Sequence, residues 1–384
     1  PLYSSAASDV YKRQVRSIIK SCGIEEMMAT GAQLIGWDQR TSPAEKSGDI
    51  VRGIGVARGF HTSGTAGPKP GEVVDYSSAT IKINEDGSVD LITPVMDHGG
   101  GTWDALAKIV AEAFKVPLDM VGLSPSDTRT TGYDVCTHAT RGIYCGGGAV
   151  EWVALQVKEK LLEFASRILD EHPHHLVLER NEKLGQAVIY PDGLPSRYIT
   201  VAQVAKTAQI KSWGTIMATD SYRQKNCPPC FVTHFIEVEV NKRTGEIKVS
   251  RAVLQGDCGT PINPDLVEGQ LVGGLSRGIG FCLLEESNHN PVTGKLASNG
   301  YLTDCKLPTA CEMPWLRDVE VRFANTWEPT GPFGAKGIGE AALNSAASAI
   351  ANAIYNAIGI RFHKLPITPE KVLRAIKENR KDVY

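Results

Sequence analysis

The sequence lacks the features of membrane, nucleic-acid-binding and disulfide-stapled proteins. No stretch reaches the roughly 18 apolar residues of a membrane helix, and the opening residues carry no secretory pattern. A net charge of −2 and a pI near 6.6 provide no basic surface for nucleic acid. The nine cysteines are odd in number and follow neither disulfide nor zinc spacing, so no metal ligands are assigned. With 384 residues, 42% of them hydrophobic, the chain is predicted to be cytoplasmic and long enough for two packed domains.

Residues 4–14 do not look like part of a fold. They read Ser-Ser-Ala-Ala-Ser-Asp-Val-Tyr-Lys-Arg-Gln and resemble the translation of a sequencing-library adapter, so residues 1–14 are excluded from the fold prediction. The native sequence is expected to begin near Val15, where the chain already has the character of a domain interior. We therefore expect a chain cut on its N-terminal side.

One unit of secondary structure is predicted to occur twice. A hairpin over residues 79–95 runs into the loop Asp97 to Thr102 and then a helix over residues 103–114. A second hairpin over residues 235–254 runs into the loop after Asp257 and then a helix over residues 264–280. The pattern predicts two related α+β subdomains whose glycine loops meet in a cleft, although hairpin-then-helix units also arise by chance.

A third loop, residues 137–142, precedes a helix predicted over residues 149–169. Arg141 among small residues at a helix start suits the recognition of phosphate, because guanidinium is bidentate and small neighbours let backbone N–H groups approach. The commoner alternative for a single arginine is an ion pair within the protein.

A fourth loop, residues 331–340, delivers one carboxylate, Glu340, to the start of a small-residue helix predicted over residues 341–358. A helix N-terminus carries partial positive charge and unpaired N–H groups, so it can hold both a bound anion and an ionised glutamate. The pattern indicates a base beside an anionic cofactor, with a simple tight turn as the alternative.

These loops together resemble the molybdenum-binding large subunit of the xanthine dehydrogenase and aldehyde oxidoreductase family, the molybdenum hydroxylases. The resemblance covers about residues 30–380 and matches the C-terminal half of that subunit in order and spacing. The stretches that carry it are Asp97 to Thr102, Ala139 to Gly142, Asp257 to Gly274, Tyr301 to Thr309 and Lys336 to Glu340.

The resemblance assigns roles to individual residues. Glu340 is implied to be the general base of a hydroxylation that takes its oxygen from water. The residues implied to hold or flank the pyranopterin and its phosphate groups are Gly99, Gly100, Gly101, Ala139, Thr140, Arg141, Gly142, Gln270, Lys336, Gly337 and Gly339. The cofactor is implied to be molybdenum-molybdopterin, with the cytosine dinucleotide form as one option. Gly100 stands where many members have glutamine, and Thr140 where serine is common.

Two absences limit what this chain is expected to do alone. The family's earlier loops, which complete the molybdenum pocket, are expected upstream of Val15. The cysteines show no iron–sulfur spacing, so iron–sulfur clusters and FAD are expected on partner domains or subunits in a hetero-oligomer.

The sequence therefore predicts an α+β fold that belongs to a molybdopterin-dependent hydroxylase of aldehydes or nitrogen heterocycles. Residues 15–70 are predicted to end a truncated first molybdopterin-binding domain, and residues 71–384 to form the second, with subdomains at about 71–225 and 226–384. The alternatives are an aromatic acyl-CoA or carbon monoxide oxidoreductase of the same family, and a non-catalytic anion-binding module.

Overall fold

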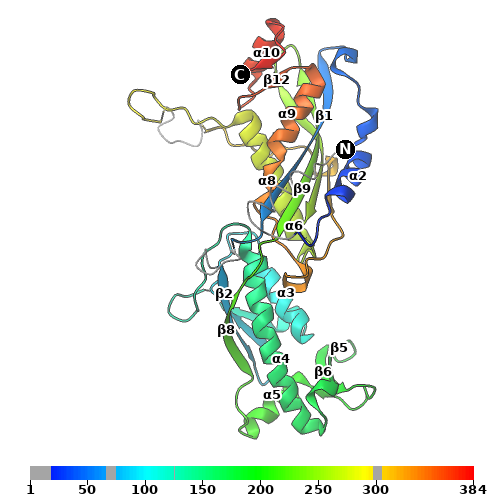
Figure 1. Ribbon diagram of the computed structural model, residues 1–384, viewed down its shortest axis with the longest axis vertical. Helices are drawn as coiled ribbons and strands as arrows, with labels where there is room; N and C mark the ends of the chain where they lie inside the picture. Colours follow the sequence, from blue (N-terminus) through cyan, green and yellow to red (C-terminus); the bar gives the residue numbers. More distant parts are fainter. Residues whose placement is uncertain (1–18, 66–74, 125, 297–304) are drawn as a thin grey trace.

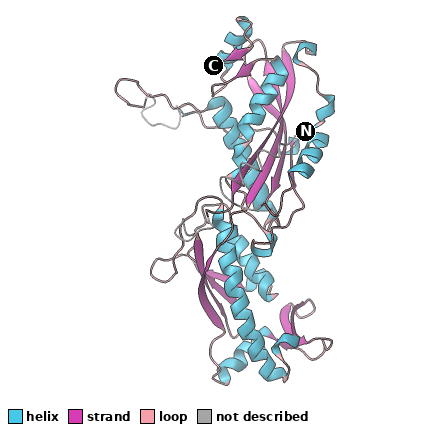
Figure 2. Cartoon of the chain, in the orientation of Figure 1, coloured by secondary structure: helices cyan, strands magenta, loops and turns pink. Residues whose placement is uncertain are grey.

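The computed structural model describes residues 19–65, 75–124, 126–296 and 305–384. These residues form two lobes stacked along the long axis of the molecule (Figure 1). The upper lobe comprises residues 19–62, 229–296 and 305–384, and the lower lobe comprises residues 76–124 and 126–223. Each lobe is built on one four-stranded sheet with helices packed against it (Figure 2).

The lower lobe contains a mixed sheet, a small three-stranded sheet and three α-helices. Its strands and α-helices are β2 (Tyr76–Ile83), β3 (Val89–Ile92), α3 (Thr102–Phe114), β4 (Val121–Ser124), α4 (Gly147–Leu169), β5 (Leu176–Asn181), β6 (Gln186–Pro191), β7 (Ile199–Thr200), α5 (Val201–Ile210) and β8 (Met217–Arg223). Two 3-10 turns, η3 (Leu118–Met120) and η5 (Pro173–His175), and one π-helical turn, η4 (Gly142–Gly146), complete it.

The upper lobe contains the second four-stranded sheet. Its strands and α-helices are α2 (Ile24–Ile35), β1 (Ile50–Thr62), β9 (Pro229–Asn241), β10 (Ile247–Asp257), α6 (Pro264–Ile279), β11 (Val319–Phe323), α8 (Ala341–Asn344), α9 (Ala346–Ile358), β12 (Arg361–Phe362), α10 (Pro369–Lys377) and β13 (Asp382–Val383). Its short turns are η1 (Trp37–Gln39), η2 (Pro43–Glu45), η6 (Gly280–Leu284), η7 (Leu316–Asp318) and η8 (Pro332–Gly334). No helix in the described part of the chain is long and apolar enough to span a bilayer.

Both sheets follow the same chain path, which confirms the predicted pair of α+β subdomains. In the lower lobe β2 and β3 form the hairpin, and α3 leads to β4, which pairs in parallel with β3. In the upper lobe β9 and β10 form the hairpin, and α6 leads to β11, which pairs in parallel with β10. The strand orders are β4-β3-β2-β8 and β11-β10-β9-β1. Each glycine loop therefore leaves the second strand of a hairpin at the same place.

Residues 50–62, in the segment expected to end an earlier domain, are part of the upper sheet. β1 pairs with β9 in antiparallel register from Ile50 opposite Asn241 to Thr62 opposite Pro229. Because β1 ends beside the glycine loops, this pairing carries His61 and Ser63 to the centre of the molecule. The domain boundaries expected from the sequence stay a prediction; the structure adds that residues 50–62 and 229–257 share one sheet.

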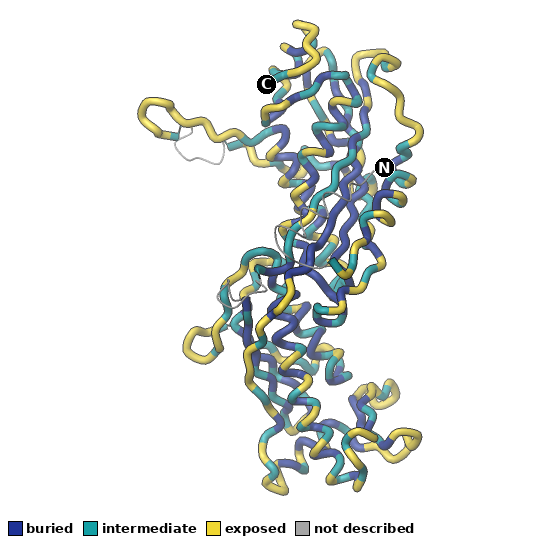
Figure 3. The backbone as a smooth tube through the Cα atoms, in the orientation of Figure 1, coloured by how far each residue is buried: buried dark blue, intermediate teal, exposed yellow. Residues whose placement is uncertain are grey.

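Small residues allow α9 to lie directly on β1. Every third or fourth residue of α9 on the buried face is alanine or isoleucine, which is the spacing of a packed helix face. A β-carbon on Gly55 would lie 2.2 Å from the carbonyl oxygen of Ala349, so glycine is required for this approach. The core of the lobe is formed by these contacts and by the apolar face of α6 (Figure 3).

The prediction of a single helix over residues 341–358 is wrong, because the structure has two helices, α8 and α9, separated at Ser345. The hydroxyl of Ser345 is buried and lies 2.9 Å from Nδ1 of His234 on β9. A serine side chain bonded outside its helix favours a local departure from helical geometry. The break keeps α8 short and places Glu340 immediately before it.

His234 makes the stability of the upper lobe depend on pH. Burial lowers the pKa of His234 to about 4, and its Nε2 has no hydrogen-bond partner among the described residues. Because the unfolded chain takes up this proton at a higher pH than the folded chain, the contribution is complete above about pH 6.5 and is lost as pH falls toward 4. We expect this histidine to account for about 3 kcal/mol of the loss in unfolding free energy between those limits.

Urea unfolding of the wild type and of His234→Gln at a series of pH values tests this expectation. The substitution is expected to lower stability at pH 7, since it disturbs a packed site, and to flatten the dependence on pH between 6.5 and 4. An unchanged slope would show that other groups cause the acid instability. His363→Gln, at an exposed histidine paired with Asp382, is the matched control and should leave the slope nearly as it is.

Candidate cofactor and active site

The glycine loops of the two lobes meet in one cavity of about 410 Å³. The lower lobe lines it with the loop before α3 and with the segment before α4, and the upper lobe with the start of α6 and with residues 336–340. The lining side chains and backbone groups come from His98, Gly100, Gly101, Thr102, Ala105, Thr137, His138, Thr140, Arg141, Gly142, Ile143, Cys258, Thr260, Pro261, Ile262, Asn263, Leu266, Val267, Gln270, Arg277, Lys336, Gly337, Ile338, Gly339 and Glu340. The predicted meeting of the loops in a cleft is confirmed.

An aspartate shapes each of the two loops that follow a hairpin. Asp97 accepts hydrogen bonds from the N–H groups of Gly99 at 2.7 Å and Gly101 at 3.2 Å, and also from that of Trp103. Asp257 accepts one from the N–H of Gly259 at 3.3 Å. Each carboxylate thus holds the backbone of its loop in a curve over the end of a helix. A β-carbon on Gly101 would lie 2.0 Å from Leu266 of α6, so the two loops are also close to each other.

The third loop holds two consecutive residues in a strained backbone conformation. Ala139 has φ of +46° and Thr140 has φ of +57°, a region in which residues other than glycine cost about 1–3 kcal/mol each. The carbonyl of Ala139 accepts a 2.7 Å hydrogen bond from Gly64 at the end of β1. Strain that is held by its surroundings is concentrated at functional sites. Here it turns the Thr140 side chain toward Glu340.

Glu340 lies at the edge of the cavity with its carboxylate half exposed. The Thr140 hydroxyl accepts the N–H of Glu340 at 3.3 Å and lies 3.1 Å from its Oε2. Because the hydroxyl has one proton and already accepts the backbone N–H, it donates to Oε2. One carboxylate oxygen is thereby fixed, and Oε1 is the oxygen left to take up a proton.

Two residues at and just after the end of β1 complete this arrangement, and neither was predicted from the sequence. Nδ1 of His61 lies 3.7 Å from Oε2 of Glu340 and 3.4 Å from the Thr140 hydroxyl. Ser63 accepts the N–H of Gly337 at 3.0 Å. Both are separated from residue 337 by more than 270 positions and reach the site only because β1 pairs with β9, so no local pattern could have pointed to them.

Arg141 lines the cavity, and its guanidinium is bonded to groups of the protein itself; its expected contact with a phosphate stays a prediction. Its side chain is 1% exposed and is held by Asp75 at 2.7 Å and by both oxygens of Asp134 at 2.6 and 2.7 Å. It also donates to the carbonyls of Tyr76 and Cys136. These partners engage all three nitrogens of the planar fork. The sequence could not show that two carboxylates, 66 and 7 residues away, converge on it.

Lys336 and Gln270 link the cofactor loops to one another and to the core. The ammonium of Lys336 is fully buried and lies 2.8 Å from Oδ1 of Asp257. The amide of Gln270 lies between two glycines, since a β-carbon on Gly100 would be 3.5 Å from its Nε2 and one on Gly339 would be 3.4 Å from its Oε1. The amide thus reaches the backbone on both sides of the cavity. Lys336 joins its own loop to the loop after β10 through its buried ion pair with Asp257.

Gly337 is the point of closest approach between the third and fourth loops. A β-carbon there would lie 2.2 Å from the carbonyl oxygen of Thr140 and 2.3 Å from its side-chain methyl. We expect Gly337→Ala to force the loops apart and to lower the free energy of unfolding by about 1–3 kcal/mol. Gly339→Ala is the matched control, since its β-carbon would meet the flexible end of Gln270 at 3.4 Å.

The measurement compares denaturant midpoints of the two variants with that of the wild type. The expected order is a clear loss for Gly337→Ala and a change within about 1 kcal/mol for Gly339→Ala. Equal losses in both variants would mean that the Thr140 contact does not decide the stability of this region.

The structure brings ten of the twelve predicted site residues to the wall of one cavity. The other two, Gly99 and Ala139, lie next to lining residues in the same loops. Their individual roles stay predictions. Arg277 of α6 also lines the cavity, is exposed, and was not singled out from the sequence, because a lone arginine in a helix carries no pattern.

Two glycine-loop subdomains surround a cavity lined by glycine backbone, hydroxyl groups and the Glu340 carboxylate. Family comparison identifies the class of protein to which this cavity belongs. A family model described as a molybdopterin cofactor-binding domain matches residues 30–314. The chain therefore belongs to the molybdopterin cofactor-binding domain family, and the resemblance predicted from the sequence is confirmed.

Relatives and solved structures agree with this assignment. The chain is 31% identical over 362 residues to the probable hypoxanthine oxidase XdhD of Escherichia coli (strain K12), covering 93% of this chain and 35% of that protein. It is 29% identical to the xanthine dehydrogenase molybdenum-binding subunit of Escherichia coli O157:H7, covering 92% of this chain and 46% of the relative. The crystal structure of quinoline 2-oxidoreductase from Pseudomonas putida 86 superposes with a TM-score of 0.78 at 27% identity, covering 96% of this chain and 45% of that one. The chain thus spans less than half the length of these relatives.

Proposed function

We propose that this chain is the C-terminal part of the catalytic subunit of a molybdenum hydroxylase that oxidises a nitrogen heterocycle or an aldehyde. The observation that carries the proposal is the carboxylate of Glu340, held by Thr140 at the edge of the loop cavity of a molybdopterin-binding chain. Relatives named for hypoxanthine, xanthine and quinoline favour a nitrogen heterocycle as the substrate class.

The residues present fit molybdopterin. Gly100 and Gly339 leave the backbone on both sides of Gln270 uncrowded, and the Gln270 amide can donate and accept hydrogen bonds with a pterin edge. Because the guanidinium of Arg141 is bonded to groups of the protein, we propose that Arg277 also contacts the phosphate group of the cofactor. The proposal includes the cytosine dinucleotide form of molybdopterin as one option for the cofactor.

In the proposed reaction, residues of this chain hold the reacting groups in place and transfer protons. Bound molybdopterin supplies the two-electron oxidation chemistry. Glu340 accepts the proton of the water-derived nucleophile at Oε1, while Thr140 holds Oε2 and prevents the carboxylate from rotating away.

We also propose that electrons leave through iron–sulfur and flavin partners in a hetero-oligomer. Support comes from the relative named as a molybdenum-binding subunit, a name that places the metal site on one component of an assembly. Within the described residues no group of three or more histidine, cysteine or acidic side chains could hold a metal ion.

The proposal is tested on the protein restored with its upstream sequence. Purified protein is assayed with hypoxanthine, quinoline and benzaldehyde and an artificial electron acceptor, and product oxygen is traced with ¹⁸O-labelled water. Protein from cells grown with tungstate in place of molybdate is the control. We expect turnover of a heterocycle that depends on molybdenum and incorporates labelled oxygen. Bound molybdopterin without turnover of any substrate would favour the non-catalytic alternative.

A further inference from the structure

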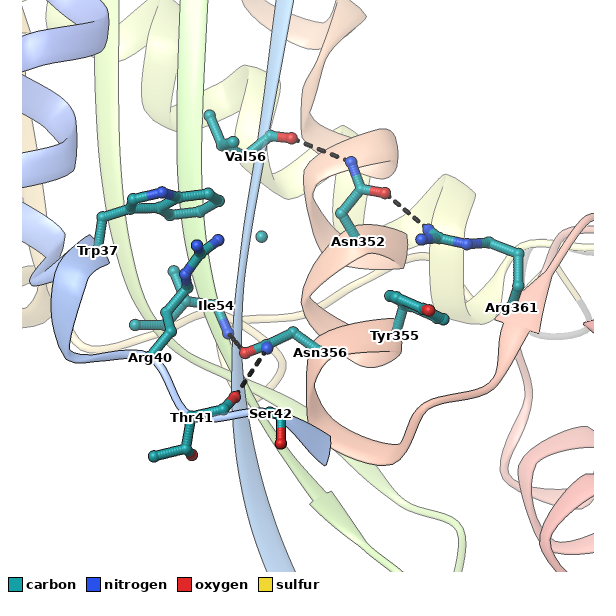
Figure 4. A pocket seen from close by; sticks show the side chains of 11 residues that line it. Trp37, Arg40, Thr41, Ser42, Ile54, Val56, Asn352, Tyr355, Asn356 and Arg361 are labelled. Atoms are coloured by element: carbon teal, nitrogen blue, oxygen red, sulfur yellow. Dashed lines mark hydrogen bonds between the residues drawn. The ribbon is translucent and has the colours of Figure 1, made fainter. Parts of the chain in front are cut away.

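A second cavity, of about 380 Å³, lies on the upper lobe and shares no residue with the cofactor cavity (Figure 4). We call it the arginine groove, and its lining residues are Trp37, Arg40, Thr41, Ser42, Ile54, Gly55, Val56, Asn352, Tyr355, Asn356 and Arg361. It runs over β1, with the segment after α2 on one side and α9 with β12 on the other. Its volume lies within the range of small-molecule sites.

The floor of the groove is the outer edge of β1. Two asparagines of α9 form hydrogen bonds with backbone groups of this strand edge. Asn356 accepts the N–H of Ile54 at 2.9 Å, and Asn352 donates to the carbonyl of Val56 at 3.0 Å. An edge strand with its groups satisfied in this way does not offer pairing to another strand. The groove is therefore suited to a ligand bound by side chains.

Arg40 forms one wall and is stacked on Trp37. Its Cζ lies 3.3 Å from the centre of the indole ring, and that ring packs edge-on against Phe235 at 5.8 Å. No carboxylate forms an ion pair with Arg40 among the residues that the structure describes. The stacking fixes the plane of the guanidinium and leaves its N–H groups available.

Arg361 forms the opposite wall with the same construction. Its Cζ lies 3.9 Å from the centre of the Tyr355 ring, and one terminal nitrogen donates to the side chain of Asn352 at 2.7 Å. Within the described chain it also has no carboxylate partner. In Figure 4 the guanidinium of Arg40 lies beside β1 next to Trp37, and that of Arg361 reaches from the other side of the groove toward Asn352.

A third basic side chain, Lys46, lies near the groove. The ammonium of Lys46 donates to the backbone and side-chain oxygens of Asn356 at 2.6 and 3.1 Å. Burial and, as a smaller effect, the charge of Arg40 lower the pKa of Lys46, because the two basic groups lie near each other. Acidic groups nearby include Asp38, which partly offsets the effect of burial on Arg40, and Glu45, which accepts the N–H of Ser42. Asp382 stands opposite Arg361 in the β12–β13 pair and is bonded to His363. An anion between the walls would relieve the repulsion.

We propose that the arginine groove binds a small phosphate-bearing molecule, with Arg40 and Arg361 gripping the phosphate from its two sides. Guanidinium forks match phosphate oxygens in bidentate geometry, and a dianion suits two of them. The volume leaves room beside the phosphate for a small organic group against Trp37 or Tyr355.

Isothermal titration at constant ionic strength with inorganic phosphate, and separately with phenyl phosphate, tests the proposal on the full chain. We expect saturable binding that Arg40→Gln and Arg361→Gln each weaken by about tenfold or more, since each removes charge-assisted hydrogen bonds. Tighter binding of phenyl phosphate would assign the site to phosphate esters, and equal binding to phosphate itself. Circular dichroism confirms that each variant is folded, and Arg361→Lys should bind with intermediate strength.

Arg317→Gln is the matched control, because Arg317 also lies over a tryptophan, at 5.7 Å from the Trp315 ring, but has a carboxylate partner in Asp318. It should bind phosphate as the wild type does. The proposal fails if phosphate does not bind, if both groove variants bind it unchanged, or if only Gln270→Ala, in the cofactor cavity, reduces binding.

Discussion

Glu340→Gln is expected to lower turnover of the restored protein by at least about 100-fold while leaving its molybdenum and pterin in place. The substitution keeps the shape of the side chain and can still accept the Thr140 hydrogen bond at one oxygen. What it removes is a group that can take up a proton. The loss should appear in kcat as well as in kcat/KM, because proton transfer belongs to the transition state.

Two measurements on the same preparation separate this role from a structural one. Metal and pterin content report cofactor loading, and steady-state assays report turnover. Glu268→Gln, at an exposed acid on α6 outside the cavity, is the matched control and should retain full activity. If Glu340→Gln turns over normally, Glu340 is not the base; if it loses the cofactor, its role is in binding.

Lys336→Met is expected to lower the free energy of unfolding by about 3–5 kcal/mol, because it leaves a buried carboxylate without its counter-charge. The side chains of Lys336 and Asp257 are both 0% exposed, and their charged atoms are 2.8 Å apart. Asp257 also accepts the N–H of Gly23 and the hydroxyl of Thr326, so it cannot move to water without breaking these bonds. The pair thus joins the cofactor loop to the first turn of α2.

Urea unfolding of a double-mutant cycle measures this coupling. Adding Asp257→Asn to Lys336→Met removes the unpaired charge, so the double variant should lose less stability than the sum of the two single variants. Lys115→Met, at an exposed lysine paired with Glu112, is the control and should change stability by less than about 1 kcal/mol. A loss for Lys336→Met no larger than that of Lys115→Met would refute the assignment of this pair as a stabilising centre.

Local sequence patterns were sufficient to predict most of the secondary-structure elements that flank the site and the loops between them. Alternation with turn residues predicted both hairpins, and apolar spacing predicted α3, α4 and α6 to within a few residues. Glycine runs beside an aspartate predicted loops at helix starts, because only glycine permits the close approaches seen at Gly101 and Gly337. These features depend on neighbours within a few positions, so they can be read from the chain itself.

The sequence by itself determined the family, the paired hairpin-and-helix units and the position of Glu340 at the start of a helix. Tertiary structure alone decided that the helix breaks at Ser345, that the guanidinium of Arg141 is held inside by Asp75 and Asp134, and that His61 lies 3.7 Å from the Glu340 carboxylate. The physical reason is the same in each case. Hydrogen bonds and ion pairs between groups distant in sequence depend on strand pairing and on the meeting of two lobes, and no local pattern encodes which distant partner arrives.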